Sequence, residues 1–269
     1  MEFQGGNSDG RSLRITVLGS GTSVGVPSIG CRCNVCTSSD PRDQRLRPSI
    51  LVRWGGRSVV IDTTPDFRQQ ALRAGMDRID AILYTHGHAD HVLGLDDVRP
   101  FNFMQNSRIP IYANEATMNT IKRCFSYIFD TKKSESSVPK IDAYTINGAA
   151  VRIDDLDFVP IPVKHGSSDV LGFRFGKAAY LTDHSSIPEE SLELLQGLDV
   201  LFLDALRYKP HPTHSTVQQS LEYVERLRPK ITYFTHICHD LGHERADSLL
   251  PPHVRLAYDG LDITLGEQN

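Results

Sequence analysis

The sequence THGHADH, residues 85–91, decides how this chain folds. It continues from IDAILYT (79–85), an apolar run typical of a buried strand, and it places His86, His88, Asp90 and His91 within six residues. On a loop that leaves a strand, two imidazoles at HxH spacing can bind one ion, and the Asp-His pair that follows can bind a second ion close by. These nitrogen and oxygen ligands suit zinc, manganese or iron. The alternative, a loop of solvated histidines, would need this clustering to arise by chance.

The composition places the chain among ordinary globular proteins. Its 269 residues are 39% hydrophobic and 23% charged, with a formal net charge of −4. This length can bury a sizeable core, and the slight negative charge argues against a general nucleic-acid binder. We find no apolar run long enough for a membrane span and no apolar signal-peptide core, and we expect a cytoplasmic protein. We expect residues 1–10 to be a disordered tail or cloning remnant and residues 11–269 to form one domain.

Apolar runs and turn residues predict the elements around the histidine motif. Strands are expected at 13–19, 49–54, 58–62, 79–85 and 109–113, then from 151 to 206 in short runs, at 231–235 and near 263. Helices are expected at 65–75, 114–129, 187–195 and 215–227, and exposed loop at 130–140. The loop 20–48 is long enough that something must hold it or use it. This alternation predicts two stacked mixed sheets with helices outside.

The HxHxDH motif resembles the signature of the metallo-β-lactamase-fold hydrolases, with every letter present. The resemblance extends from Leu13 onward and implies an α/β (α+β) protein, a four-layer αββα sandwich of two mixed β-sheets. Other landmarks of the family occur in the expected order, each at the end of a β-rich run: Asp62, His165, Asp183 and His236. Singly, each could be a turn residue or a core histidine. Their joint presence argues against coincidence.

This resemblance implies a dinuclear metal site. One metal would be bound by His86, His88 and His165, the other by Asp90, His91 and His236, with Asp183 bridging the two. Asp62 would support the metal-binding loop from behind. Gly87 stands where flavodiiron relatives carry an acidic residue, which argues against an oxygen-reducing di-iron role. Class B β-lactamases differ from the pattern at the second metal, so the hydrolytic branch fits best.

Three cysteines point to a second kind of metal site. Cys31, Cys33 and Cys36 supply three thiolates, one fewer than a closed tetrahedral zinc site needs. The pattern resembles the phosphoribosyl cyclic phosphate phosphodiesterases of phosphonate breakdown. In that subfamily such a loop binds structural zinc together with a histidine three residues after the last catalytic one, which implies His239 here. Cys238 is the competing fourth ligand, and a redox-active cluster or surface thiols are the alternatives to zinc.

A leaving alkoxide needs a proton, and HPTHST (211–216) offers two histidines just before a predicted helix. In the resembling subfamily, a histidine about twenty residues before the last metal ligand acts as general acid, and His214 matches that spacing. His211 is the alternative. Either could instead be an ordinary surface residue, with Thr213 or Ser215 capping the helix.

Three further residues are candidates for substrate contacts. GLDDVRPFN (94–102) and DTTPDFRQQ (62–70) depart from the subfamily, and each contains an arginine whose guanidinium fork could bind phosphate, Arg99 and Arg68. Surface ion pairing is the common alternative. His184, which follows Asp183, could touch the substrate or lie in a solvated loop. The metal chemistry therefore transfers from the resemblance more directly than the substrate does.

Together these features predict a dinuclear metal-dependent phosphodiesterase. We expect it to hydrolyse a small cyclic or activated phosphodiester, such as phosphoribosyl cyclic phosphate or a cyclic nucleotide, with metal-activated water as nucleophile. The expected cofactors are two divalent ions (zinc, manganese or iron) and one structural zinc. The resemblance also suggests a homodimer. One alternative is a tRNA 3′-processing endonuclease, although no extended basic arm is present. Another is an accessory protein of the pyrroloquinoline-quinone pathway type, which lacks the dinuclear site.

Overall fold

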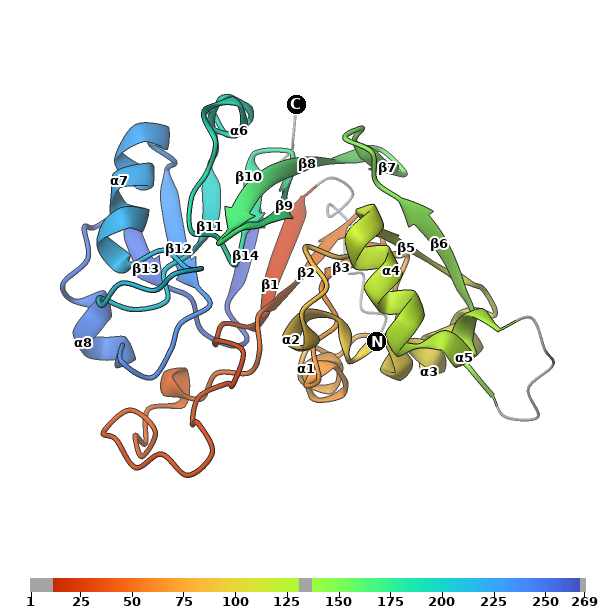
Figure 1. The fold of residues 1–269 in the computed structure, drawn as a ribbon, viewed down its shortest axis with the longest axis horizontal. Helices are drawn as coiled ribbons and strands as arrows, with labels where there is room; N and C mark the ends of the chain where they lie inside the picture. Colours follow the sequence, from red (N-terminus) through yellow and green to blue (C-terminus); the bar gives the residue numbers. More distant parts are fainter. Residues whose placement is uncertain (1–11, 131–136, 267–269) are drawn as a thin grey trace, which may run out of the picture.

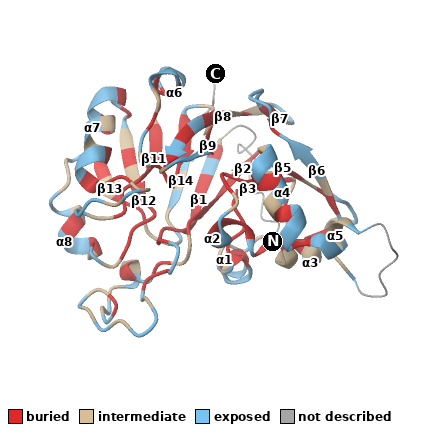
Figure 2. Ribbon diagram, viewed as in Figure 1, coloured by how far each residue is buried: buried red, intermediate tan, exposed pale blue. Residues whose placement is uncertain are grey.

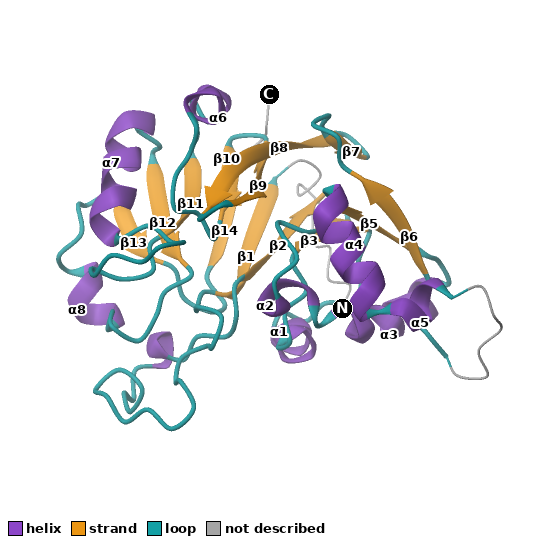
Figure 3. Cartoon of the chain, in the orientation of Figure 1, coloured by secondary structure: helices purple, strands orange, loops and turns teal. Residues whose placement is uncertain are grey.

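The computed structural model describes residues 12–130 and 137–266 and contains two seven-stranded mixed β-sheets packed face to face (Figures 1 and 3). The strand order is β14-β1-β2-β3-β4-β5-β6 in the first sheet and β13-β12-β11-β10-β9-β8-β7 in the second. Helices cover the outer face of each sheet. The predicted αββα sandwich is therefore confirmed. The expected tail at 1–10 and most of the expected loop at 130–140 lie outside the described residues.

The first sheet combines antiparallel and parallel pairs. Its strands are β1 (Leu13–Gly19), β2 (Ser49–Trp54), β3 (Arg57–Ile61), β4 (Ala81–Leu83), β5 (Ile109–Ala113), β6 (Ile141–Thr145) and β14 (Asp262–Leu265). Strands β14, β1, β2 and β3 pair antiparallel, whereas β3 to β6 run parallel. Because parallel strands end at the same edge of a sheet, the residues after β3 and β4 lie side by side.

The second sheet has the same mixed character. Its strands are β7 (Val151–Ile153), β8 (Leu156–His165), β9 (Ser168–Phe175), β10 (Ala178–Leu181), β11 (Val200–Asp204), β12 (Ile231–Thr235) and β13 (Val254–Leu256). Strands β7 to β10 form an antiparallel meander, and β10 to β13 are parallel. The carboxyl ends of β10, β11 and β12 therefore also meet at one edge.

Helices pack on the outer face of each sheet, and their burial fits this position. On the first sheet lie α1 (Phe67–Arg73), α2 (Ala89–Val92), the 3₁₀ turn η2 (Leu95–Val98), α3 (Arg99–Gln105), α4 (Glu115–Cys124) and α5 (Ser126–Phe129). On the second lie α6 (Glu189–Leu194), α7 (Val217–Leu227) and α8 (His243–Asp247). The 3₁₀ turn η1 (Pro41–Asp43) interrupts the long loop after β1. Their outward faces are exposed, while the strands between them are mostly buried (Figure 2).

Three apolar clusters hold these layers together. The central cluster joins the inner faces of the two sheets, for example through Trp54 of β2 against Phe158 of β8, whose ring centroids are 5.8 Å apart. A second cluster fastens α1, α3 and α4 to the first sheet, and a third fastens α6 and α7 to the second. Burial of apolar surface in three stacked interfaces is the main stabilising contribution to such a sandwich. Every helix of the described residues is too short or too polar to cross a bilayer.

Some predicted elements differ from the observed ones. The helix expected at 114–129 is broken at Phe125, which adopts a non-helical conformation between α4 and α5. The helix expected from 215 begins at Val217, and its cap is Thr216 rather than Thr213 or Ser215. The sequence reading missed β6 and β13: β6 buries only one residue fully, so it lacks a clear apolar alternation, and β13 has three residues.

Candidate metal centre

The ends of five strands from both sheets deliver the predicted site residues to one place. Asp62 follows β3, and the histidine motif follows β4 and runs into α2. From the second sheet come His165 at the end of β8, Asp183 after β10 and His236 after β12. Residues separated by as many as 174 positions in sequence thus converge because the two sheets present their strand ends to a common edge.

Three of these residues have an unusual backbone conformation. Asp62, Asp183 and His236 have φ values of 67°, 53° and 57°, in the left-handed region that non-glycine residues rarely adopt. In each case the turn falls immediately after a strand, so it redirects the side chain at the edge of the sheet. Such conformations persist where the surroundings determine them, and they are frequent at functional sites.

The first group of possible ligands consists of His86, His88, His165 and Asp183. One ligand atom from each lies within 4.8 Å of the others. His86 Nε2 is 2.9 Å from His88 Nδ1 and 3.8 Å from Asp183 Oδ2. His165 Nδ1 donates to the carbonyl of Thr213 at 2.8 Å, which leaves its Nε2 for an ion. His88 is the exposed member, so this group borders the open side of the site.

The second group consists of Asp90, His91, Asp183 and His236, all buried. His91 Nε2 lies 3.2 Å from Asp90 Oδ2 and 3.4 Å from Asp183 Oδ1. His236 Nε2 lies 3.3 Å from Asp183 Oδ2. Asp183 therefore belongs to both groups: its Oδ1 faces His91, and its Oδ2 lies between His236 and His86, where a bridging carboxylate is expected.

The donor atoms fit a pair of divalent cations. Asp90 Oδ2, His91 Nε2 and His236 Nε2 are buried and have no hydrogen-bond partner among the described residues. Buried polar atoms in a folded protein are almost always satisfied, so these atoms call for a partner. Two ligands bound to one tetrahedral ion lie about 3.3 Å apart, close to the separations found here. The nitrogen and carboxylate set suits zinc, manganese or iron equally well.

The pKa values of two histidines also indicate that the site suits a cation. Burial lowers the pKa of His236, but Asp183 and Asp90 outweigh that effect and raise the pKa to about 9. For His91 too, burial is outweighed by Asp183, Asp90 and Asp62, and its pKa lies well above the usual range. The second group therefore favours additional positive charge, whereas burial lowers the pKa of His86 and His165 in the first group. A divalent cation between these side chains would supply it.

Asp62 lies behind the second group, where the sequence predicted support for the metal loop. Its Oδ2 lies 2.8 Å from His91 Nδ1 and also accepts from the hydroxyl of Thr85 at 2.8 Å. Its Oδ1 accepts from the backbone N–H of Thr85 at 2.9 Å. The carboxylate is fully buried. Asp62 thus fixes both the start of the histidine motif and the ring orientation of His91, leaving Nε2 for an ion.

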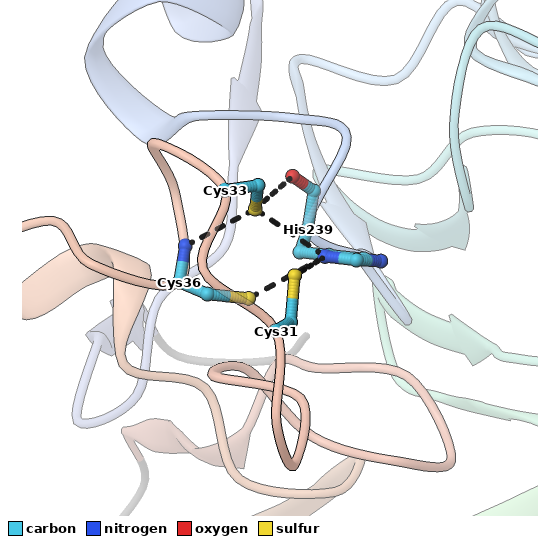
Figure 4. A group of neighbouring side chains, drawn as sticks. All are labelled: Cys31, Cys33, Cys36 and His239. Carbon is cyan, nitrogen blue, oxygen red and sulfur yellow. Dashed lines mark hydrogen bonds between the residues drawn. The ribbon is translucent and has the colours of Figure 1, made fainter.

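The cysteine loop forms a separate group. Cys31, Cys33 and Cys36 direct their sulfur atoms toward His239 Nδ1, at 3.2, 3.4 and 3.4 Å (Figure 4). The backbone N–H of Cys36 contributes most to lowering the pKa of the Cys33 thiol, to about 6, which favours the thiolate that zinc requires. Cys238 is not a member of this group; its sulfur accepts from the backbone N–H of Asp240. The arrangement matches a Cys₃His zinc site.

His214 lies at the edge of the His/Asp centre. Its Nε2 is 4.0 Å from Asp183 Oδ2, and its ring stacks on His236 with centroids 4.5 Å apart. Its Nδ1 lies 2.7 Å from Oδ2 of Asp204, a fully buried residue at the end of β11. Sequence reasoning missed Asp204. The available signal was an aspartate closing the apolar run VLFLDAL, the same pattern that singled out Asp62 and Asp183.

The structure corrects the predicted substrate contact of His184, and it does not support those of Arg99 and Arg68. His184 is fully buried, with Nδ1 bonded to Ser215, so it does not contact substrate directly. Arg99 bonds to the carbonyl of Ser137 and pairs with Asp96, away from the His/Asp groups. Arg68 is exposed on α1, and its backbone faces Asp97. No hydrogen bond or ion pair of the described residues links either arginine to the metal groups.

The two stretches that depart from the resembling subfamily instead pack on each other. The backbone N–H of Gly94 donates to the carbonyl of Thr63 at 2.9 Å. A Cβ at position 94 would lie 2.0 Å from the carbonyl oxygen of Thr64, so only glycine permits this approach. The two stretches are therefore in direct backbone contact. His211, the alternative acid, lies beside His214 with ring centroids 5.1 Å apart, and its Nδ1 is engaged by Thr213.

The geometry and the comparisons with known proteins agree on the class. Residues 57–237 match the family model of the beta-lactamase superfamily domain, so the chain belongs to this superfamily. More particularly, it is 54% identical to a diphosphatase from the PhnP family of known structure. The two structures superpose with a TM-score of 0.90 over 96% of this chain and 99% of that one. The predicted family resemblance is thereby confirmed.

Two curated relatives carry other names. An octanoyltransferase from Porphyromonas gingivalis is 37% identical over 260 residues, which are 95% of this chain and 52% of that protein. A ribonuclease Z from Bradyrhizobium diazoefficiens is 28% identical over 186 residues, which are 65% of this chain and 61% of that protein. The chain thus spans only part of the length of these relatives, and their named activities are said of those proteins.

Proposed function

We propose that this chain is a dinuclear metal-dependent phosphohydrolase that cleaves a small, activated phosphodiester or diphosphate bond with water. The observation that carries the proposal is the position of Asp183. Its carboxylate belongs to both His/Asp groups and also lies 4.0 Å from Nε2 of His214. A phosphorus atom held at the two groups would therefore have a proton donor on one side, as an in-line displacement requires.

The residues that would hold the two ions are those of the two groups. His86, His88 and His165 would bind one ion and Asp90, His91 and His236 the other, with Asp183 between them. When bound, two such ions lower the pKa of water and neutralise the charge of a phosphoryl transition state. We propose zinc or manganese here, with iron as the alternative, and a third, structural zinc at the cysteine loop.

The chain's own proton donor is His214. Asp204 accepts the Nδ1–H, which fixes the ring and leaves the transferable proton of the imidazolium on Nε2. A water that has released one proton to solvent forms the new oxygen–phosphorus bond while the bond to the leaving oxygen breaks. That oxygen takes the proton from His214 Nε2, and the imidazole becomes neutral. The Asp204 carboxylate keeps its contact with Nδ1 and holds the ring in this orientation.

Two sources suggest the substrate class. The diphosphatase relative, at 54% identity, supports a diphosphate linkage. The resemblance of the cysteine loop to that of the phosphodiesterases of phosphonate breakdown supports a cyclic phosphodiester such as phosphoribosyl cyclic phosphate. Both classes present a phosphorus atom with an ester or anhydride leaving group that is stabilised by protonation, so the same site suits both.

A substrate screen tests the proposal. Purified protein, supplied separately with zinc, manganese and iron, is offered bis-p-nitrophenyl phosphate, 2′,3′-cyclic nucleotides, a ribosyl cyclic phosphate and dinucleoside diphosphates, with thioesters and lactones as comparison. We expect turnover of the phosphorus substrates alone, abolished in Asp183→Asn. A metal-replete protein inactive on every phosphorus compound, or one that prefers thioesters, would contradict the proposal.

A tRNA 3′-processing nuclease is the second candidate, favoured by the 28% identity to ribonuclease Z. The net charge of −4 weighs against it, because RNA binding depends on neutralising phosphates with Lys and Arg. Incubation with precursor tRNA, followed by a gel shift and cleavage mapping, decides between the two.

A biosynthetic accessory role requires no dinuclear site. Metal analysis addresses it: about one ion per chain would favour that role, and about three would favour the hydrolase.

A further inference from the structure

One loop carries the proton donor of the proposed reaction. We call residues 207–216, which join β11 to α7, the acid loop. Its two ends meet, because Leu206 N–H donates to the carbonyl of Ser215 at 3.1 Å and Val217 N–H to the carbonyl of Arg207 at 3.0 Å. Between these ends lies His214. These two backbone hydrogen bonds fix the base of the acid loop. The direction of the His214 ring depends on the contacts of the residues on either side of it.

Contacts from the second sheet hold the acid loop on both sides of His214. On one side, His165 Nδ1–H donates to the carbonyl of Thr213 at 2.8 Å. On the other, Ser215 makes two contacts with His184: its N–H donates to the His184 carbonyl at 2.7 Å, and its Oγ lies 3.0 Å from His184 Nδ1. The loop is thus fastened at the residue before His214 and the residue after it.

His184 also reaches the carboxylate that orients His214. Its backbone N–H donates to Asp204 Oδ2 at 3.0 Å, the same oxygen that faces His214 Nδ1 at 2.7 Å. The His184 side chain is fully buried and lies against Tyr223 of α7, with ring centroids 5.8 Å apart. It therefore cannot reach substrate, yet it contacts both the chain neighbour of His214 and its hydrogen-bond partner.

We propose that His184 is a positioning residue for proton donation, which acts through Ser215 to aim His214 Nε2 at the leaving oxygen. The inference rests on the proposed function, because it needs a leaving group that His214 protonates. Its physical basis is that proton transfer requires a donor within about 2.6–3.2 Å of the acceptor. A misplacement of about 1 Å can cost on the order of 100-fold in rate. His184 follows Asp183 directly, so the turn that places the bridging carboxylate also places the support of the acid.

The test separates loss of proton donation from general damage by using two leaving groups. Bis-p-nitrophenyl phosphate releases p-nitrophenolate, which needs no proton at neutral pH. The comparison substrate is the alkoxide-releasing phosphodiester that wild type cleaves fastest in the screen above. In Ser215→Ala and His184→Leu we expect kcat to fall about 10- to 100-fold on the alkoxide substrate and less than about 3-fold on bis-p-nitrophenyl phosphate.

Two controls make the comparison sharp. His184→Asn keeps a hydrogen-bonding atom near the position of Nδ1 and is expected to restore most of the alkoxide activity. Ser191→Ala removes another buried hydroxyl, which donates to the carbonyl of Pro162 at 2.6 Å and contacts neither His184 nor His214, and is expected to leave the ratio of the two rates unchanged. Melting temperature and metal content are measured for each variant to exclude unfolding.

The outcomes distinguish the inference from the function on which it rests. Equal losses on both substrates, unchanged rates, or no restoration by His184→Asn would overturn the positioning role. If wild type cleaves neither substrate, the proposed function is wrong. The positioning role is then decided by the imidazole ¹⁵N shifts of His214, which we expect to change in Ser215→Ala and to stay fixed in Ser191→Ala. Unchanged shifts in both variants would refute it.

Discussion

Two histidines of the site, His91 and His214, each have a buried aspartate beside Nδ1. Asp62 is fully buried and lies 2.8 Å from Nδ1 of His91, the nitrogen that faces away from the two groups. A carboxylate in that position fixes the ring, makes its other nitrogen a better donor and adds negative charge near the ion. Asp204 has the same relation to His214, so a buried carboxylate supports both a proposed metal ligand and the proposed proton donor.

Replacement of Asp62 by Asn tests this support. The amide keeps the shape and can still accept from Thr85, but it removes a buried negative charge next to His91. We expect the affinity for the more weakly held of the two ions to fall about 10- to 100-fold. Competition with a chromophoric chelator measures the change. Asp157→Asn, an exposed pairing partner of Arg152, is the matched control and should bind metal as wild type does.

A second residue-scale prediction concerns acid stability. His243 is buried beside the cysteine loop, and burial, Arg42 and Arg45 lower its pKa to about 4. Asp40 and Asp247 act in the opposite direction but more weakly. Since the folded pKa lies below that of the unfolded chain, the unfolded state binds the proton first as the pH falls. His243 therefore costs no stability above pH 6.5 and an increasing amount as the pH falls toward 4.

Replacing His243 with a residue that does not titrate should reduce the dependence of the unfolding free energy on pH. In His243→Gln we expect the loss of unfolding free energy between pH 6.5 and pH 4 to be smaller than in wild type by roughly 1–2 kcal/mol. This difference is smaller than the full pKa shift would give, because the ring borders an open surface pocket where solvent screens its charge. Urea unfolding across this pH range, at matched metal content, measures it. His253→Gln replaces an exposed histidine and should leave the slope unchanged; an equal effect in both variants would contradict the argument.

At the scale of elements, helix α7 is the support on which the acid loop ends. Its cap is a reciprocal pair: Thr216 Oγ1 accepts from Gln219 N–H at 3.2 Å, and Gln219 Oε1 accepts from Thr216 N–H at 2.9 Å. We expect Thr216→Ala to lower the unfolding free energy by about 1 kcal/mol and the melting temperature by about 2–4 °C. Thermal unfolding followed by circular dichroism measures this. Gln218→Ala, one position from Gln219 and exposed, should be neutral.

Features that are local in the sequence could be predicted, whereas contacts that depend on the pairing of distant strands could not. The histidine motif and the cysteine loop are local, so their spacing identified them, whereas Asp62, Asp183 and His236 were located by the family resemblance, each at the end of an apolar run. His184 was misjudged because Asp183 adopts a left-handed turn, so that its side chain faces the His/Asp groups while the side chain of His184 is buried in the core. The role of Asp204 depends on the parallel pairing of β10 and β11, which no local pattern reveals.

At the scale of the whole molecule, metal binding and the joining of the two sheets are linked. The long loop leaves β1 of the first sheet, and its cysteines meet His239, just beyond β12 of the second (Figures 1 and 4). Fully buried Arg45 of the loop bonds to the carbonyls of Cys238 and Leu241 and pairs with Asp43 at 2.8 Å. The His/Asp centre likewise draws ligands from both sheets. Each ion would therefore cross-link elements that are separate in the unfolded chain.

Chelation should consequently destabilise the protein in two separable parts. A ligand that binds only the folded state at 100 times its Kd adds about 2.7 kcal/mol, which corresponds to a rise of roughly 5–10 °C in melting temperature for a chain of this size. We expect metal-free wild type to melt lower by at least that amount. Asp183→Asn and Cys36→Ser should each lose one share of the metal-dependent rise, and the double variant should lose nearly all of it. Calorimetry with and without zinc measures each share. A double variant that zinc still stabilises fully would show that the ion binds elsewhere, because each group of described residues through which a cation would join the sheets contains Asp183 or Cys36.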